Sequence, residues 1–118
     1  METEEKNSNV LTKALSILEY MSRQKKRTSI QELSQELGIS SPSVHRILQI
    51  LKADGYVQQE KNKQYSLTYK LLELSSYSMM QNGLIEQVLP FMNYFAQQKN
   101  CQVGLSVQYG ESILHLAT

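Results

Sequence analysis

The chain has 118 residues, of which 41% are hydrophobic, enough for one ordinary domain or for a small domain with part of another. Its acidic, polar first residues argue against a secretory signal, and no apolar run approaches the roughly 20 residues that span a bilayer. Cys101 is the only cysteine, which excludes an intramolecular disulfide and a thiolate metal cluster. We therefore expect a cytoplasmic protein that does not associate with membranes.

Positive charge is concentrated in one segment, although the whole chain carries only +1. Residues 10–70 hold ten basic residues and five acidic ones, a net charge of +5. The flanking segments, 1–9 and 71–118, each carry a net charge of −2. Such a distribution favours contact between the segment 10–70 and a polyanion.

Two helices are predicted in the first third of the chain. Residues 1–9 show no hydrophobic periodicity and are expected to form a flexible tail. From Val10 to Met21 apolar residues recur at three- and four-residue spacing, which predicts an amphipathic helix. Ser29 and Glu32 have the spacing of a capping box at the start of a short second helix, which Gly38 ends.

The third predicted helix runs from Ser41 to Asp54, with Ser40 or Ser41 as its cap. Its apolar stripe consists of Val44, Ile47, Leu48 and Leu51, and its opposite face of Pro42, Arg46, Gln49 and Ala53. Two short strands, 56–60 and 64–67, follow and form a hairpin with a basic tip. This order predicts a winged helix-turn-helix over residues 10–68, in a fold that is mainly α with a small β-wing (α+β).

A winged helix-turn-helix binds duplex DNA through its third helix and its wing. Arg46 is predicted to contact a guanine edge or a phosphate, and Gln49 an adenine. Lys61 and Lys63 are expected to reach the flanking backbone or minor groove. Further candidate DNA contacts are Ser41, Ser43, His45, Thr28 and Ser29. The alternative is that these are solvated polar positions, and capping alone already accounts for Ser29.

The remaining residues are expected to form a linker helix, 69–82, followed by a further helix and a hairpin within 83–118. Dimerisation through the linker helix would use Leu71, Leu72, Leu74, Tyr77 and Met79; the alternative is packing against the chain's own winged domain. In the last segment Pro90 must kink or restart a helix. The final hairpin, 103–116, leaves an open apolar edge, to be covered by the preceding helix, by a partner chain or by both.

No catalytic constellation can be assembled from one Asp, one Cys and two His, and there is no glycine-rich phosphate loop. We therefore expect neither an enzyme nor a metal or cofactor. The competing hypothesis is a winged-helix protein-interaction module without DNA binding. The placement of positive charge disfavours this interaction module, because protein docking alone requires neither Arg46 on the third helix nor two lysines at the wing tip.

Several segments resemble the IclR family of bacterial transcription regulators. They are Leu11-Thr-Lys-Ala-Leu-Ser-Ile-Leu-Glu-Tyr, Gln31-Glu-Leu-Ser-Gln-Glu-Leu-Gly-Ile, Val44-His-Arg-Ile-Leu, Asp54-Gly-Tyr-Val and Tyr65-Ser-Leu-Thr-Tyr-Lys-Leu-Leu-Glu-Leu, followed by Val88-Leu-Pro-Phe-Met and the last hairpin. The segment 40–43, Ser-Ser-Pro-Ser, lacks the lysine that family members often carry there. The operator preference of the family therefore does not transfer.

The resemblance implies a homodimer on a palindromic operator, with a higher oligomer left open, and repression is the commoner mode in that family. It also implies a small organic effector, but only where a complete C-terminal domain exists. By this resemblance residues 83–118 are the beginning of an effector-binding domain, which is incomplete because the family's domain extends well beyond residue 118. The operator, the effector and the sign of regulation are not encoded in recognisable residues.

Overall fold

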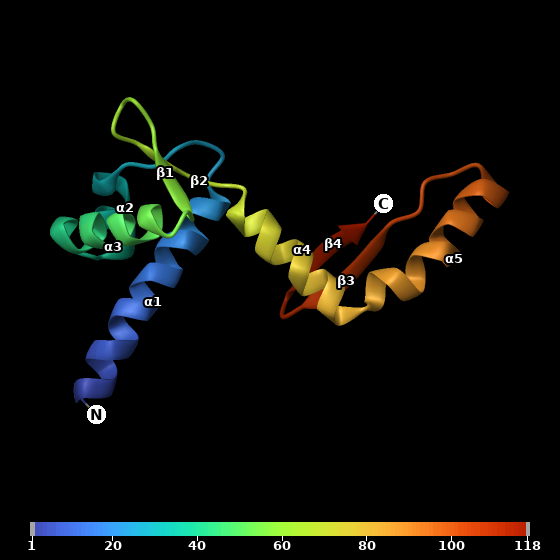
Figure 1. Ribbon diagram of the computed structural model, residues 1–118, viewed down its shortest axis with the longest axis horizontal. Helices are drawn as coiled ribbons and strands as arrows, with labels where there is room; N and C mark the ends of the chain where they lie inside the picture. Colours follow the sequence, from blue (N-terminus) through green and yellow to red (C-terminus); the bar gives the residue numbers. More distant parts are fainter. Residues whose placement is uncertain (1, 118) are drawn as a thin grey trace. The chain divides into compact units, whose positions relative to one another are not determined.

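The computed structural model describes residues 2–117, with side chains from 9 to 116, and divides into two compact units on either side of the Leu71–Leu72 bond. The first unit contains α1 (Glu2–Arg23), α2 (Ile30–Leu37), α3 (Ser41–Ala53), β1 (Val57–Gln59) and β2 (Tyr65–Leu67) (Figure 1). The second contains most of α4 (Lys70–Asn82), then α5 (Leu84–Lys99), β3 (Leu105–Tyr109) and β4 (Ser112–Ala117). The protein is therefore mainly helical with two small hairpins.

Helix α1 begins at Glu2, so the flexible tail predicted for residues 1–9 differs from the structure. No glycine or proline lies between Glu2 and Val10, so this stretch holds neither of the two residues that most strongly disfavour a helix. The start of the apolar periodicity at Val10 marks where packing begins. It does not mark where the helix begins.

The predicted caps place α2 and α3. The Ser29 hydroxyl accepts a hydrogen bond from the Glu32 amide at 3.1 Å, and Gly38 ends α2 with φ +65°. Ser40 caps α3 and accepts from the Ser43 amide. The capping box is only half formed, because the Glu32 carboxylate accepts a hydrogen bond from the Tyr20 hydroxyl at 2.7 Å instead.

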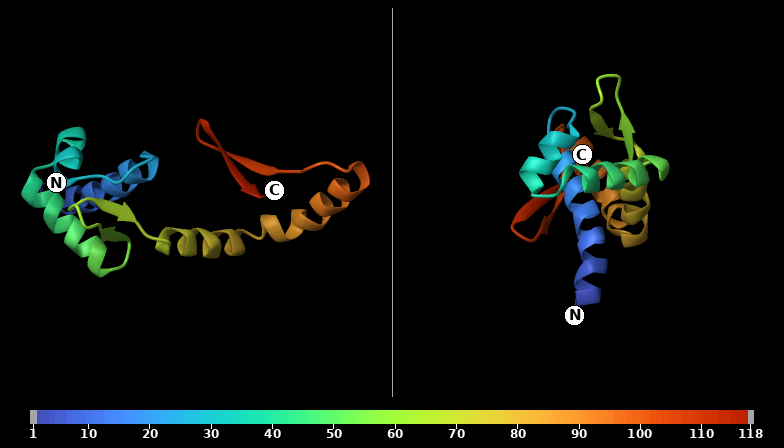
Figure 2. Two further views of the ribbon diagram at one scale, coloured as in Figure 1. Left: turned by 90° about the horizontal axis from the view of Figure 1, so that it is seen from above. Right: turned by 90° about the vertical axis from the view of Figure 1, so that its left-hand side faces the viewer.

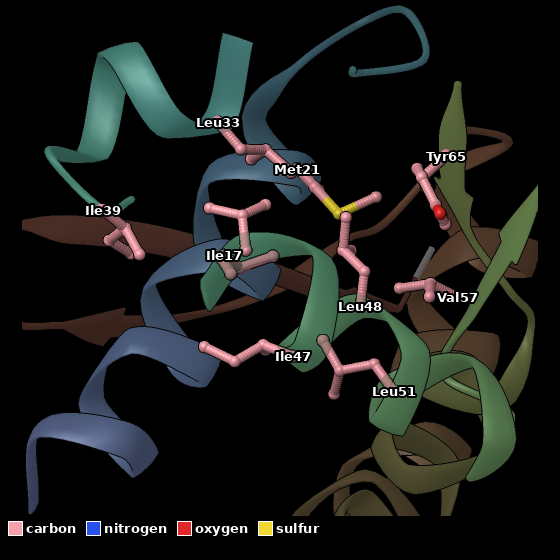
Figure 3. Close-up of a cluster of buried hydrophobic side chains, with 10 residues drawn as sticks. Ile17, Met21, Leu33, Ile39, Ile47, Leu48, Leu51, Val57 and Tyr65 are labelled. Carbon is pink, nitrogen blue, oxygen red and sulfur yellow. The ribbon is translucent and has the colours of Figure 1, made fainter. Parts of the chain in front are cut away.

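The core of the first unit is built from every one of its elements. Ile17 of α1 and Leu33 of α2 meet Leu48 of α3, and all three are fully buried (Figure 3). Val57 and Tyr65 close the core from the hairpin side, at 2% and 1% exposed. This shared core fixes α3 between α2 and the hairpin, leaving its opposite face in solvent.

The hairpin β1–β2 is antiparallel, with Val57 opposite Leu67 and Gln59 opposite Tyr65. Thr28 adds a third, one-residue strand: its amide and carbonyl both bond to Tyr65, at 3.0 and 2.7 Å. The loop at residues 60–64 projects from the unit as the wing (Figures 1 and 2). The sequence predicted both strands and this loop.

The second unit has little core. Met92 of α5 is its only hydrophobic side chain that is buried among the described residues. Strands β3 and β4 pair antiparallel around Gly110, while Tyr109 and Ile113 remain 72% and 76% exposed. Helix α5 continues through Pro90 without ending. None of the described helices is both long and apolar enough to span a membrane.

Candidate nucleic-acid interface

The outer face of α3 forms the first part of the candidate interface. Ser41, His45 and Arg46 are exposed, as expected for positions opposite the stripe that packs into the core. Within residues 9–116 the Arg46 guanidinium makes no ion pair or hydrogen bond, so its donors are available to a ligand. Ser43 is half-buried, and its hydroxyl accepts a hydrogen bond from the Ser40 hydroxyl at 2.9 Å.

Gln49 of α3 is hydrogen-bonded to a residue of the wing strand β2. Its side-chain Nε2 donates a hydrogen bond to the Tyr65 hydroxyl at 3.2 Å, and Gln49 is half-buried. A primary amide has two donor hydrogens and one acceptor, so a second N–H and Oε1 remain for a base edge. Gln49 is therefore held in one orientation by a buried tyrosine of β2.

The wing tip is a tight turn with exposed lysines. The Lys63 amide donates to the Glu60 carbonyl at 3.1 Å, and the Glu60 amide donates to the Gln64 carbonyl. Lys61 and Lys63 are both exposed. Lys63 has φ +64°, a left-handed conformation that glycine and asparagine adopt more readily than lysine. The turn thus projects two positive charges into solvent at some conformational cost.

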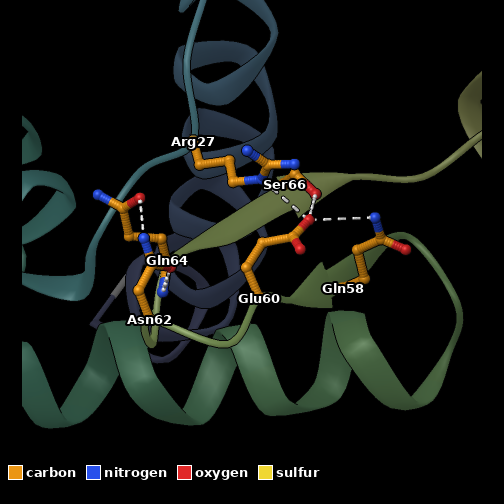
Figure 4. A network of polar contacts seen from close by, with 6 residues as sticks. All are labelled: Arg27, Gln58, Glu60, Asn62, Gln64 and Ser66. Carbon is orange, nitrogen blue, oxygen red and sulfur yellow. Dashed lines mark hydrogen bonds and ion pairs between the residues drawn. The ribbon is translucent and has the colours of Figure 1, made fainter.

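An ion-pair network stabilises the base of the wing (Figure 4). Arg27 Nε lies 3.0 Å from Glu60 Oε1, which also accepts hydrogen bonds from the Ser66 hydroxyl at 3.0 Å and from the side-chain Nε2 of Gln58 at 3.3 Å. These contacts, with Arg27 first, lower the pKa of the Glu60 carboxyl below its usual 4.5. Arg27 is therefore engaged in holding the wing to the segment between α1 and α2.

Two predicted contact residues do not present free side chains. Thr28 is only 1% exposed and its backbone belongs to the wing sheet, so its hydroxyl does not reach the outer surface. Ser29 is half-buried, and its hydroxyl is occupied by the Glu32 amide at the start of α2. For Thr28 this corrects the prediction, because periodicity alone did not show that this residue enters a sheet.

Sequence reasoning did not predict the Arg27–Glu60 and Gln49–Tyr65 pairs. Their members lie 33 and 16 positions apart in the chain, and a polar residue carries no local signal of a distant partner.

The predicted dimerisation residues lie on a helix without a buried side chain. Leu72, Leu74 and Tyr77 of α4 are 64%, 45% and 58% exposed. Leu71 and Met79 are half-buried. This amount of exposed apolar surface is unusual for a helix in its final environment.

The first unit is a helix-turn-helix followed by an antiparallel wing, with exposed basic side chains on its third helix and two lysines at the wing tip. This arrangement defines the class of winged helix-turn-helix DNA-binding domains. Among the described side chains, His, Cys, Asp and Glu form no group of three or more that could hold a metal ion.

Comparison with known proteins shows which type of winged helix-turn-helix this domain resembles. Residues 10–61 match the IclR helix-turn-helix domain. Over 110 residues the chain is 40% identical to the HTH-type transcriptional regulator KdgR of Escherichia coli. This alignment covers 92% of this chain and 41% of KdgR. It is 26% identical over 113 residues to the glycerol operon regulatory protein of Streptomyces griseus, covering 93% of this chain and 44% of that protein.

Solved structures agree with this comparison. An IclR family transcriptional regulator from Brucella abortus superposes with a TM-score of 0.73 at 25% identity, over 90% of this chain and 41% of that one. The IclR of Thermotoga maritima shares the fold, with a TM-score of 0.72 at 21% identity, over 92% of this chain and 44% of that one. Residues 10–61 form an IclR-type helix-turn-helix domain, and the chain is similar to IclR-type regulators, of whose length it spans less than half.

Proposed function

We propose that this chain is a sequence-specific DNA-binding transcription regulator that acts in the cytoplasm as a repressor, bound as a dimer to a palindromic operator. The observation that carries the proposal is Arg46, exposed on the outer face of α3 without a partner in the described part of the chain. Its guanidinium can pair bidentately with a guanine edge. Both curated relatives described above are named as regulators.

Each remaining side chain of the interface has a role that follows from its placement. Lys61 and Lys63 would contact phosphates, which adds affinity but no sequence preference. Gln49 would use its remaining amide hydrogen and Oε1 on an adenine. Ser41, Ser43 and His45 would contact phosphates near the start of α3, where the helix dipole also favours an anion. Thr28 and Ser29 are not part of this proposal, because one is buried and the other caps α2.

Titration of the full chain against mixed-sequence duplex DNA at several salt concentrations tests DNA binding. We expect affinity that falls steeply as salt rises, because phosphate contacts release bound counterions. Undetectable affinity at low salt would contradict the proposal and favour the protein-interaction module. Arg46→Ala should cost about 1–3 kcal/mol on a selected operator and relax its sequence preference. Lys99→Ala on α5 is the control for loss of one positive charge outside the interface.

The dimer would form through α4, none of whose side chains is fully buried among the described residues. Leu72 and Tyr77, at 64% and 58% exposed, are the strongest candidates for the interface. Sedimentation of the full chain at micromolar concentration should give a dimer, and Leu72→Glu should shift it towards monomer. A wild-type chain that sediments as a monomer would count against pairing through α4. A small-molecule effector is proposed only for a complete effector domain.

A further inference from the structure

The end of the recognition helix α3 is fastened to the start of α4. Lys70 Nζ donates a hydrogen bond to the Asp54 carbonyl at 2.7 Å and lies 4.7 Å from the centre of the Tyr56 ring. The Thr68 hydroxyl donates to the Gly55 carbonyl, and the Thr68 amide donates to the Tyr56 carbonyl at 3.0 Å. Thr68 Oγ1 also accepts from the Lys70 amide at 3.3 Å. We call these five residues the α3–α4 clamp.

The clamp satisfies carbonyls that a helix end leaves without partners. The last carbonyls of α3 and of its turn carry the negative end of the helix dipole, which favours an ammonium group. Tyr56 adds a cation–π contact on the other side of Lys70. Gly55 has φ +89°, and a Cβ at this position would lie 3.6 Å from Lys70 Cδ, so the lysine stem packs against the turn. Charge and packing therefore both hold Lys70 in place.

The clamp lies at the start of α4, close to the end of the DNA-binding unit. Lys70 is the first residue of α4 and belongs to the DNA-binding unit, whereas α4 from Leu72 onward belongs to the second unit. The chain passes from the DNA-binding unit into the rest of α4 at Leu71, and the contacts of Thr68 and Lys70 hold the residues just before this point against the end of α3.

We propose that Thr68 and Lys70 are positioning residues that set the half-site spacing a dimer of this chain accepts. The inference rests on the proposed function, since it requires DNA binding by a dimer joined through α4. Each added base pair rotates a half-site by about 35° and displaces it along the duplex, so a rigid connection tolerates few spacings. A loosened connection would let each winged domain follow its own half-site.

The test compares operators that differ only in spacing. A duplex is first selected from a random pool by the full wild-type chain, and palindromes are then built from it with the centre lengthened or shortened by single base pairs. Binding is measured for these duplexes and for an isolated half-site. Lys70→Met keeps the apolar stem and removes the ammonium, Thr68→Val removes the hydroxyl, and Lys70→Arg is the conservative variant. Lys52→Met, which removes a charge from the last turn of α3 outside the clamp, is the matched control.

We expect the wild-type chain to prefer one spacing by about tenfold or more. Lys70→Met and Thr68→Val should keep half-site affinity within about twofold while this preference falls to about threefold. Lys70→Arg should restore the preference, and Lys52→Met should leave it unchanged. Unchanged spacing preference in both clamp variants would overturn the inference, and so would an equal loss of affinity for half-site and palindrome. Absence of duplex binding by the wild-type chain would instead overturn the proposed function.

Discussion

Replacing Lys63 by glycine should stabilise the first unit while weakening DNA binding. Lys63 has φ +64°, and the left-handed conformation costs a residue with a side chain about 1–2 kcal/mol. Glycine removes this cost but adds about 0.5–1 kcal/mol of backbone entropy lost on folding. The net gain in unfolding free energy is about 0.5–1 kcal/mol, or several degrees in the midpoint of thermal unfolding.

Lys61→Gly provides the matched control. It removes the same charge from the same turn, but Lys61 is not among the residues with positive φ. This variant therefore gains nothing from glycine and should lose about 0.5–1 kcal/mol. The two variants should consequently differ by about 1–2 kcal/mol, which is the cost of the left-handed lysine itself.

Both variants should weaken binding to duplex DNA of any sequence, because each removes one phosphate contact. The slope of log affinity against log salt should decrease by about 1 in each case. The assays are denaturant unfolding of the full chain and duplex titration at several salt concentrations. If Lys63→Gly is destabilised as much as Lys61→Gly, the left-handed strain is refuted. If neither variant changes the salt slope, the wing tip does not contact phosphate.

Three further variants probe the core and the wing. Tyr65→Phe removes the hydroxyl that holds Gln49, so stability should fall by about 1 kcal/mol and discrimination at one adenine should weaken; unchanged discrimination would show that Gln49 does not depend on Tyr65. Glu60, with its pKa lowered mainly by Arg27, stabilises the fold above its unfolded pKa, and this contribution should disappear as pH falls below about 4.5. Glu60→Gln should flatten that part of the stability curve, which acid titration followed by circular dichroism would measure. Leu48→Ala, at a fully buried site, should cost about 2–5 kcal/mol in denaturant unfolding, and a cost below 1 kcal/mol would place this side chain outside the core.

Periodicity and capping chemistry placed most elements of the first unit correctly. Val44, Ile47, Leu48 and Leu51 were predicted to share one stripe, and all four are buried on α3. Gly38 was predicted to end α2 and does so in a left-handed conformation. These predictions hold because a helix aligns side chains every 3.6 residues and its ends need specific partners.

The same local reasoning gave a wrong start for α1 and misplaced Thr28. Helix α1 begins at Glu2 even though the residues before Val10 lack an apolar stripe. The sequence predicts Thr28 as a phosphate contact at the start of α2, but its backbone pairs with Tyr65, 37 positions later, and its side chain is buried. A polar residue in a short connecting segment gives no sign of such pairing, since the partner strand is defined only once the core has formed.

By itself, the sequence determined the order of elements, the buried face of each helix in the first unit and the clustering of positive charge on residues 10–70. These properties depend on neighbours within a turn or a hairpin. Only the tertiary structure decided which polar groups are free and which are engaged. Among the side chains that the structure describes, Arg46 has no partner, Arg27 pairs with Glu60, and Lys70 donates a hydrogen bond to the Asp54 carbonyl at the end of α3. Such pairings depend on distances between segments far apart in the chain, which the packing of the core sets and no local pattern records.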